Sequence, residues 1–94
     1  MLSKIPLQLD KIKKEDVDKE ILRAGIMAEL DAINLYEQMA AMAQKKEIRR
    51  ILPDIAREEK THVGEFQALL LRKDREQAEE LQAGEREVRE KTGL

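Results

Sequence analysis

The chain is 94 residues long, which is enough for one small domain. Charged residues make up 40% of the sequence and aromatic residues only 2%, so the large rings that usually fill a small core are nearly absent. This composition favours long amphipathic helices that bury apolar surface against a partner. The net charge of −2 comes from 18 basic and 20 acidic side chains interspersed along the chain, which argues against nucleic-acid binding. The absence of cysteine excludes disulfides and thiolate metal sites.

The N-terminal residues lack the continuous apolar stretch of a secretory signal, and no stretch approaches the roughly 18 apolar residues of a membrane span. We therefore expect a cytoplasmic protein with no membrane partner. Residues 1–13 contain Pro6 among short apolar alternations, and we expect them to form an irregular or extended N-terminal arm.

Two long helices are predicted next, and they form a hairpin over residues 14–73. The first spans about residues 14–43 and is interrupted only by Gly25, which is expected to mark a close approach between helices. After a short polar break, the second spans about residues 46–72 and continues through Pro53 with a kink. The alternative is a second helix that begins at Pro53.

A shorter third helix is predicted within residues 74–94. Asp74 is a good N-cap residue, and Gln77 three positions later completes a capping-box pattern. The helix is expected to run to about Lys91 and to stop at Gly93. Its apolar strip is too thin to fold by itself, so we expect it to pack on a partner.

Both long helices carry inward positions at alternating spacings of four and three residues, the pattern of a helix bundle. In the first helix this seam comprises Leu22, Ile26, Glu29, Ile33, Tyr36, Ala40 and Ala43. In the second helix it comprises Ile48, Leu52, Ile55, Glu59, His62, Phe66 and Leu69. An uncompensated buried carboxylate costs several kcal/mol, so charged groups at the centre of facing seams indicate a bound cation.

The register of the hairpin predicts that three of these groups converge. The midpoint of Glu29 and Glu59 is position 44, within the polar break at residues 44–46, so the two carboxylates should lie at the same height. His62 is three residues after Glu59 and points from the same helix face. Oxygen and imidazole ligands suit iron or manganese, at one ion per chain, and zinc or calcium could substitute.

A ferritin-type di-metal centre draws two such ligand sets from four helices, so this chain holds half of one. A two-fold dimer would complete it. The predicted fold is therefore all-α: an antiparallel two-helix hairpin with a short C-terminal helix, dimerising into a ferritin-like four-helix bundle.

Less specific interpretations stay open. A Glu-x-x-His pair occurs by chance in many helices, a seam glutamate can simply set register, and His62 can be an ordinary core residue. Tyr36 is either a hydrogen-bond donor to a ligand carboxylate or a core ring whose hydroxyl bonds elsewhere. Glu58 is interpreted as solvated surface charge, and Asp31 points to another helix face.

The stretches Ala28–Glu37 (AELDAINLYE) and Asp54–Phe66 (DIAREEKTHVGEF) resemble the encapsulated ferritins, half-length relatives of ferritin and rubrerythrin, and especially their archaeal-type members. The resemblance covers about residues 15–90. It rests on the thirty-residue spacing from Glu29 to Glu59, with the histidine and the tyrosine in place.

This resemblance implies that Glu29, Glu59 and His62 are the ligands of a ferroxidase centre formed between two chains, with Tyr36 beside them. It implies oxidation of Fe(II) by dioxygen, assembly into a ring-like decamer, and residence in an encapsulin nanocompartment whose shell protein encloses the stored iron. Some relatives have an acidic and an aromatic residue where this chain has Ala28 and Leu35, so only a weak iron-entrance site, at Asp31, is expected.

The final residues, KTGL, show no recognisable peptide of the kind that docks cargo to a shell. Because some members of the family are fused to the shell protein, two interpretations stay open: a stand-alone chain and a domain of such a fusion. Two rival functions remain at this point: a non-catalytic helical oligomerisation module, and an iron-binding buffer that binds iron without turnover.

Overall fold

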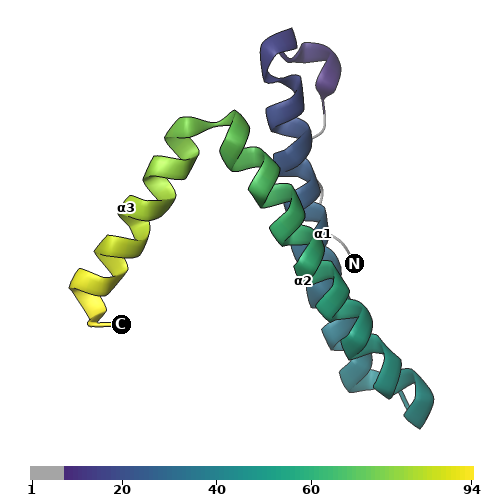
Figure 1. Ribbon diagram of the computed structural model, residues 1–94. Helices are drawn as coiled ribbons and strands as arrows, with labels where there is room; N and C mark the ends of the chain where they lie inside the picture. The colour runs from purple at the N-terminus through teal and green to yellow at the C-terminus, as the bar shows by residue number, and fades with distance from the viewer. Residues whose placement is uncertain (1–7) are drawn as a thin grey trace.

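The computed structural model describes residues 8–94, and this part of the chain contains helices and no strand. The elements are the 3-10 turns η1 (Leu9–Lys11) and η2 (Lys14–Asp16) and the helices α1 (Val17–Met42), α2 (Lys46–Lys73) and α3 (Arg75–Thr92). In Figure 1, α1 and α2 lie side by side as an antiparallel hairpin, and α3 turns away from the end of α2. The prediction of an all-α hairpin with a short C-terminal helix is confirmed.

The first helix begins three residues later than the sequence pattern predicts. Residues Lys14–Asp16 form a 3-10 turn, in which the Asp16 N–H donates to the Lys13 carbonyl at 2.9 Å. The acidic side chains of this region suit the start of either kind of helix, because both expose unpaired N–H groups there. Within the predicted N-terminal arm, Leu9–Lys11 form another 3-10 turn, and residues 1–7 of that prediction lie outside the described residues.

The second helix continues through Pro53, so the alternative start at Pro53 is wrong. Proline removes one backbone hydrogen bond, which by itself would weaken a helix. On either side of it, however, Leu52 and Ala56 are 8% and 2% exposed, so both are buried. The packing of this face on α1 holds the backbone helical across the missing bond.

The third helix is capped at both ends by the predicted residues. The Gln77 N–H donates to the Asp74 Oδ1 atom at 3.1 Å, and Gly93 ends the helix with a positive φ of 77°. The reciprocal half of the predicted capping box does not form. The Asp74 N–H donates instead to the Leu70 carbonyl at 2.9 Å, because α2 runs directly up to this residue.

The buried apolar core of the described chain is small and lies along the hairpin. Its members are Ala24, Ile33, Leu52, Ala56 and Leu70. The radius of gyration is 16.6 Å, whereas a compact domain of this length would have about 12 Å. Ile48 and Leu69, predicted to face inward at the ends of the α2 seam, are each 47% exposed. A single hairpin cannot cover them, which is consistent with a requirement for partner contacts.

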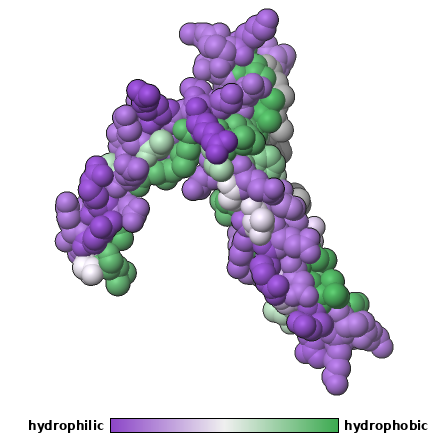
Figure 2. Space-filling view, viewed as in Figure 1, coloured by the Kyte–Doolittle hydropathy of each residue, from purple (hydrophilic) through white to green (hydrophobic). Residues whose placement is uncertain are grey.

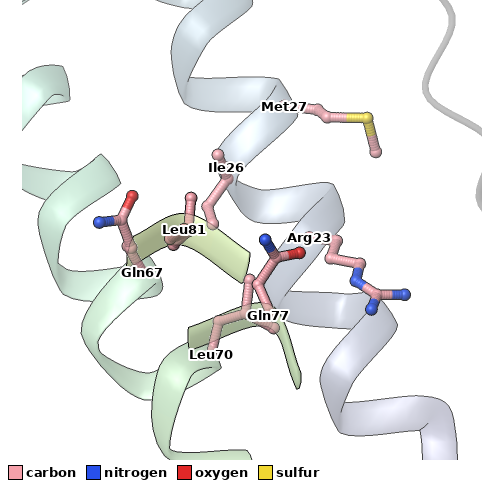
Figure 3. A pocket seen from close by; sticks show the side chains of 7 residues that line it. All are labelled: Arg23, Ile26, Met27, Gln67, Leu70, Gln77 and Leu81. Carbon is pink, nitrogen blue, oxygen red and sulfur yellow. The ribbon is translucent and has the colours of Figure 1, made fainter. Parts of the chain in front are cut away.

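An apolar groove of about 380 Å³ lies in the corner between α3 and the hairpin. Figure 3 shows Ile26 of α1, Leu70 of α2 and Leu81 of α3 around it, and Figure 2 shows the hydrophobic surface of this corner. The groove is separate from the predicted metal ligands. None of the helices in residues 8–94 has both the length and the apolar character needed to cross a bilayer.

Candidate metal centre

Glu29 of α1 and Glu59 and His62 of α2 lie together midway along the hairpin. The His62 Nδ1 atom is 3.3 Å from the Glu29 Oε2 atom and 3.6 Å from the Glu59 Oε2 atom. One ligand atom from each residue lies within 4.8 Å of the other two. Within residues 8–94, this is the one group of three or more acidic, histidine or cysteine side chains close enough to share an ion.

The antiparallel hairpin explains this convergence. Only residues 43–45 connect α1 to α2, so residues at equal distances from that connection lie opposite each other. Glu29 and Glu59 have their midpoint at residue 44, and His62 is one turn beyond Glu59 on the same side of α2. The structure therefore brings together the three residues that the sequence analysis singled out. Their role as metal ligands stays a prediction.

The three side chains differ in exposure in a way that gives the cluster an open side. The side chains of Glu29 and Glu59 are each 18% exposed, whereas that of His62 is 44% exposed. Ile51 lies eleven residues before His62, and Leu69 lies seven residues after it. Both separations are close to a whole number of helical turns, so all three residues share one face of α2. Both flanking residues are about half exposed. The imidazole thus lies between two exposed apolar side chains on one face of α2.

The carboxylates and the imidazole perturb each other's protonation. A hydrogen bond with Glu59, burial and the charge of Glu59 together raise the pKa of Glu29, and contact with His62 only partly offsets them. Burial lowers the pKa of His62, but the hydrogen bond and charge of Glu29, aided by Glu59, outweigh it and leave this pKa raised. Glu29 and His62 therefore bind protons more readily than isolated side chains when no other cation is present. A divalent ion would displace those protons.

The donor set fits a divalent transition metal. Imidazole and carboxylate bonds to such ions are about 2.0–2.2 Å long, so two ligands of one ion lie at most about 4.4 Å apart. The distances from His62 to both glutamates already satisfy this limit. Two carboxylates also balance the charge of one divalent ion. Three protein ligands leave further positions on an ion open, and the exposed side of His62 is where a second copy of the chain could supply more.

The other singled-out residues do not join this group. Tyr36 is half-buried on the same face as Glu29 but lies two turns away, about 10 Å along the helix axis. Asp31 lies roughly 200° around α1 from Glu29 and is not part of the cluster. Glu58 is exposed, as predicted. A weak iron-entrance site at Asp31 and a role for Tyr36 beside the metal stay predictions.

One ion pair between α1 and α2 has no recognisable signal in the sequence. The Lys60 Nζ atom of α2 lies 3.3 Å from the Glu37 Oε2 atom of α1. Both side chains are more than half exposed. Charged residues are so frequent in this chain that no spacing distinguishes such a pair from its neighbours, so it could not have been predicted.

The chain is similar to known proteins along most of its length. The chain is 56% identical, over 97 aligned residues, to a ferritin-like–encapsulin shell fusion protein of Pyrococcus furiosus, and the match covers all of this chain but 28% of that protein. The crystal structure of the encapsulated ferritin domain from Pyrococcus furiosus matches with a TM-score of 0.84 and 52% identity, covering 100% of this chain and 96% of that one. The EncFtn-like family matches residues 5–84, and the chain belongs to this family.

Proposed function

We propose that the chain is a ferroxidase, which oxidises Fe(II) to Fe(III) with dioxygen at a centre formed between two copies of itself. The observation that carries this proposal is the convergence of Glu29, Glu59 and His62 in a member of the EncFtn-like family. Iron is the substrate as well as the occupant of the centre, and each Fe(II) gives up one electron to dioxygen.

The number of metal ligands in one chain supports a centre built from two chains. A ferritin-type centre uses one glutamate from each of two helices and a Glu-x-x-His pair from each of two others. In this chain α1 supplies Glu29, and α2 supplies Glu59 and His62. The exposed apolar side chains of Ile51 and Leu69, on either side of His62, mark the surface on which a second hairpin would pack. A two-fold dimer would then place two ligand sets face to face.

The residues of the chain have distinct tasks in this proposal. Glu29 and Glu59 neutralise the two charges of one Fe(II). A bound cation displaces protons from these carboxylates. Their low exposure strengthens their attraction for the ion, because less water screens it. His62 supplies one neutral nitrogen from the open side, and three ligands leave room for dioxygen to approach.

The test compares two adjacent glutamates of α2. Glu59→Gln removes one ligand charge with little change of shape, and Glu58→Gln makes the same change at an exposed position. We expect Glu59→Gln to reduce Fe(II) oxidation to the background rate in air, followed by the absorbance of Fe(III). Glu58→Gln should keep the rate of the unsubstituted chain. A Glu59→Gln variant as fast as Glu58→Gln would contradict the assignment.

Fe(II) binding without oxygen, followed by repeated oxidation in air, separates the rival functions. A helical oligomerisation module binds no iron under saturating anaerobic Fe(II), and an iron buffer binds it without repeated turnover. We expect about one iron per chain, in line with half a di-metal centre, and continued oxidation when more Fe(II) is supplied. Binding that stops after a single stoichiometric oxidation would favour the buffer.

We further propose that the chain delivers its product inside an encapsulin nanocompartment in the cytoplasm, as a ring-like decamer. The support is the Pyrococcus furiosus relative, whose name describes a fusion of a ferritin-like part with an encapsulin shell. Expression of the chain fused to, and separately from, such a shell protein tests this. Purified shells should retain iron only when the fused part carries an intact Glu59.

A further inference from the structure

We propose that Gly25 and Phe66 form a positioning pair, which sets the spacing of α1 and α2 at the metal centre and so brings Glu29 and His62 together. This inference rests on the proposed function. It assigns a role in metal binding to two residues that carry no ligand atom.

The first step is the close contact between these residues. A Cβ atom added at Gly25 would lie 3.0 Å from both the Cε1 and Cζ atoms of Phe66 and 3.1 Å from its Cδ1 atom. Ordinary contacts between carbon atoms are about 3.5–4.0 Å. The phenylalanine ring therefore lies against the α1 backbone in space that any other residue at position 25 would fill.

The second step is the register of this contact. Gly25 is four residues before Glu29 in α1, and Phe66 is four residues after His62 in α2. Because the helices are antiparallel, the pair lies one turn beyond the 3.3 Å contact between His62 and Glu29, about 6 Å along the axis. A change in helix separation at the ring is therefore transmitted to the ligands one turn away.

The third step is that the helices are also held on the other side of the ligands. Ile33, four residues after Glu29, is 8% exposed, and Ala56, three residues before Glu59, is 2% exposed. These small and medium side chains hold α1 and α2 close there. The ligands thus lie between a tightly packed segment and the ring of the chain's one phenylalanine. A displacement at the ring would tilt the helices about the packed segment and open the centre.

The experiment uses the full chain and Co(II) under anaerobic conditions, read out by the visible absorption of the bound ion. Gly25→Ala should weaken Co(II) binding about tenfold or more, the range found when residues that orient metal ligands are changed. Its Co(II) spectrum should also change, because the ligands are displaced rather than lost. Circular dichroism should show unchanged helix content, since alanine favours helix over glycine.

Two further variants make the test specific. Gly64→Ala is the matched control, because an added Cβ there has nothing within 4 Å, and its Co(II) affinity should equal that of the unsubstituted chain. Gly25→Ala combined with Phe66→Leu removes the two ring atoms that would lie at 3.0 Å. This double variant should recover most of the lost affinity and the original spectrum. Its Co(II) binding can be measured even if Gly25→Ala alone does not fold.

The possible outcomes are distinct. Unchanged Co(II) affinity in Gly25→Ala would overturn the positioning role, and so would a double variant that binds no better than the single one. Weakened binding that is rescued in the double variant supports the role. Absence of Co(II) binding by the unsubstituted chain would overturn the proposed metal centre itself, and with it this inference.

Discussion

The Arg23 Nη2 atom lies 2.8 Å from the Asp74 Oδ2 atom, a contact that joins α1 to the start of α3 across 51 positions of sequence. The other carboxylate oxygen of Asp74 accepts the Gln77 N–H and caps α3. The Asp74 side chain is only 10% exposed. One carboxylate therefore begins the third helix and fixes it to the hairpin.

Replacement of Asp74 should loosen α3. Asp74→Ala removes both the cap and the partner of Arg23, and we expect Tm to fall by roughly 4–8 °C, as for the loss of a helix cap in a domain of this size. Asp74→Asn keeps a capping oxygen but loses the charge, so its Tm should fall less. Melting curves must be recorded at one protein concentration, because association also shifts Tm. Identical curves for Asp74→Ala and the unsubstituted chain would refute the role of this residue.

Asp74 should also make the free energy of unfolding depend on pH in the acid range. The hydrogen bond from Gln77 is the main cause of a lowered pKa of Asp74. Together with the contact and charge of Arg23 and the charge of Lys19, it outweighs the opposing effect of burial. A lowered pKa in the folded state means that the stabilisation is present above the ordinary aspartate pKa of about 3.9 and is lost as the pH falls through the folded value. Urea unfolding between neutral and acid pH should show the stability of the unsubstituted chain approaching that of Asp74→Asn below this range. A constant difference at every pH would contradict this.

Much of the hairpin could be predicted because its signals are local or follow from simple register. The alternation of apolar positions continues across Pro53, so a continuous helix was expected there and is present. The position of Glu29 relative to Glu59 and His62 follows from a short connection between two antiparallel helices. The close approach marked by Gly25 was also predicted, and Phe66 is the residue that fills the space.

The direction of α3 could not be predicted. It depends on the contact between Arg23 and Asp74, and one arginine among 18 basic residues carries no signal that identifies its partner. The failed half of the capping box has a similar cause. Whether the Asp74 N–H is available depends on how far α2 extends, and helix ends are the part of a sequence pattern with the weakest signal.

Metal binding should depend on pH through His62. The neighbouring carboxylates raise the pKa of this imidazole, and a metal ion requires its neutral nitrogen. The Co(II) affinity should therefore fall as the pH drops below the raised pKa, by about tenfold per pH unit for one displaced proton. His62→Ala should bind more weakly with a shallower dependence. Equal slopes for the two proteins would exclude His62 as the competing group.

The exposed ion pair between Lys60 and Glu37 should contribute little to stability or metal binding. The Lys60 and Glu37 side chains are 59% and 53% exposed, so water and salt screen their attraction. We expect Lys60→Ala to change the free energy of unfolding by no more than about 0.5 kcal/mol and to leave Co(II) affinity unchanged. A large loss of Co(II) affinity would show that this pair, rather than the packing of Gly25 and Phe66, controls the helix spacing.

Assembly should control activity even when every ligand is intact. Ile51 is 52% exposed on the same face of α2 as His62, so Ile51→Glu places a charge on the surface where the second hairpin is proposed to pack. Met42→Glu makes the same change at the end of α1, where the side chain is already 79% exposed. In sedimentation velocity, Ile51→Glu should shift the chain toward monomers, and both iron stoichiometry and oxidation rate should fall with it. Met42→Glu should keep all three properties. If the Ile51→Glu monomer oxidised Fe(II) at the rate of the unsubstituted chain, one hairpin would be sufficient, and the two-chain centre would have to be abandoned.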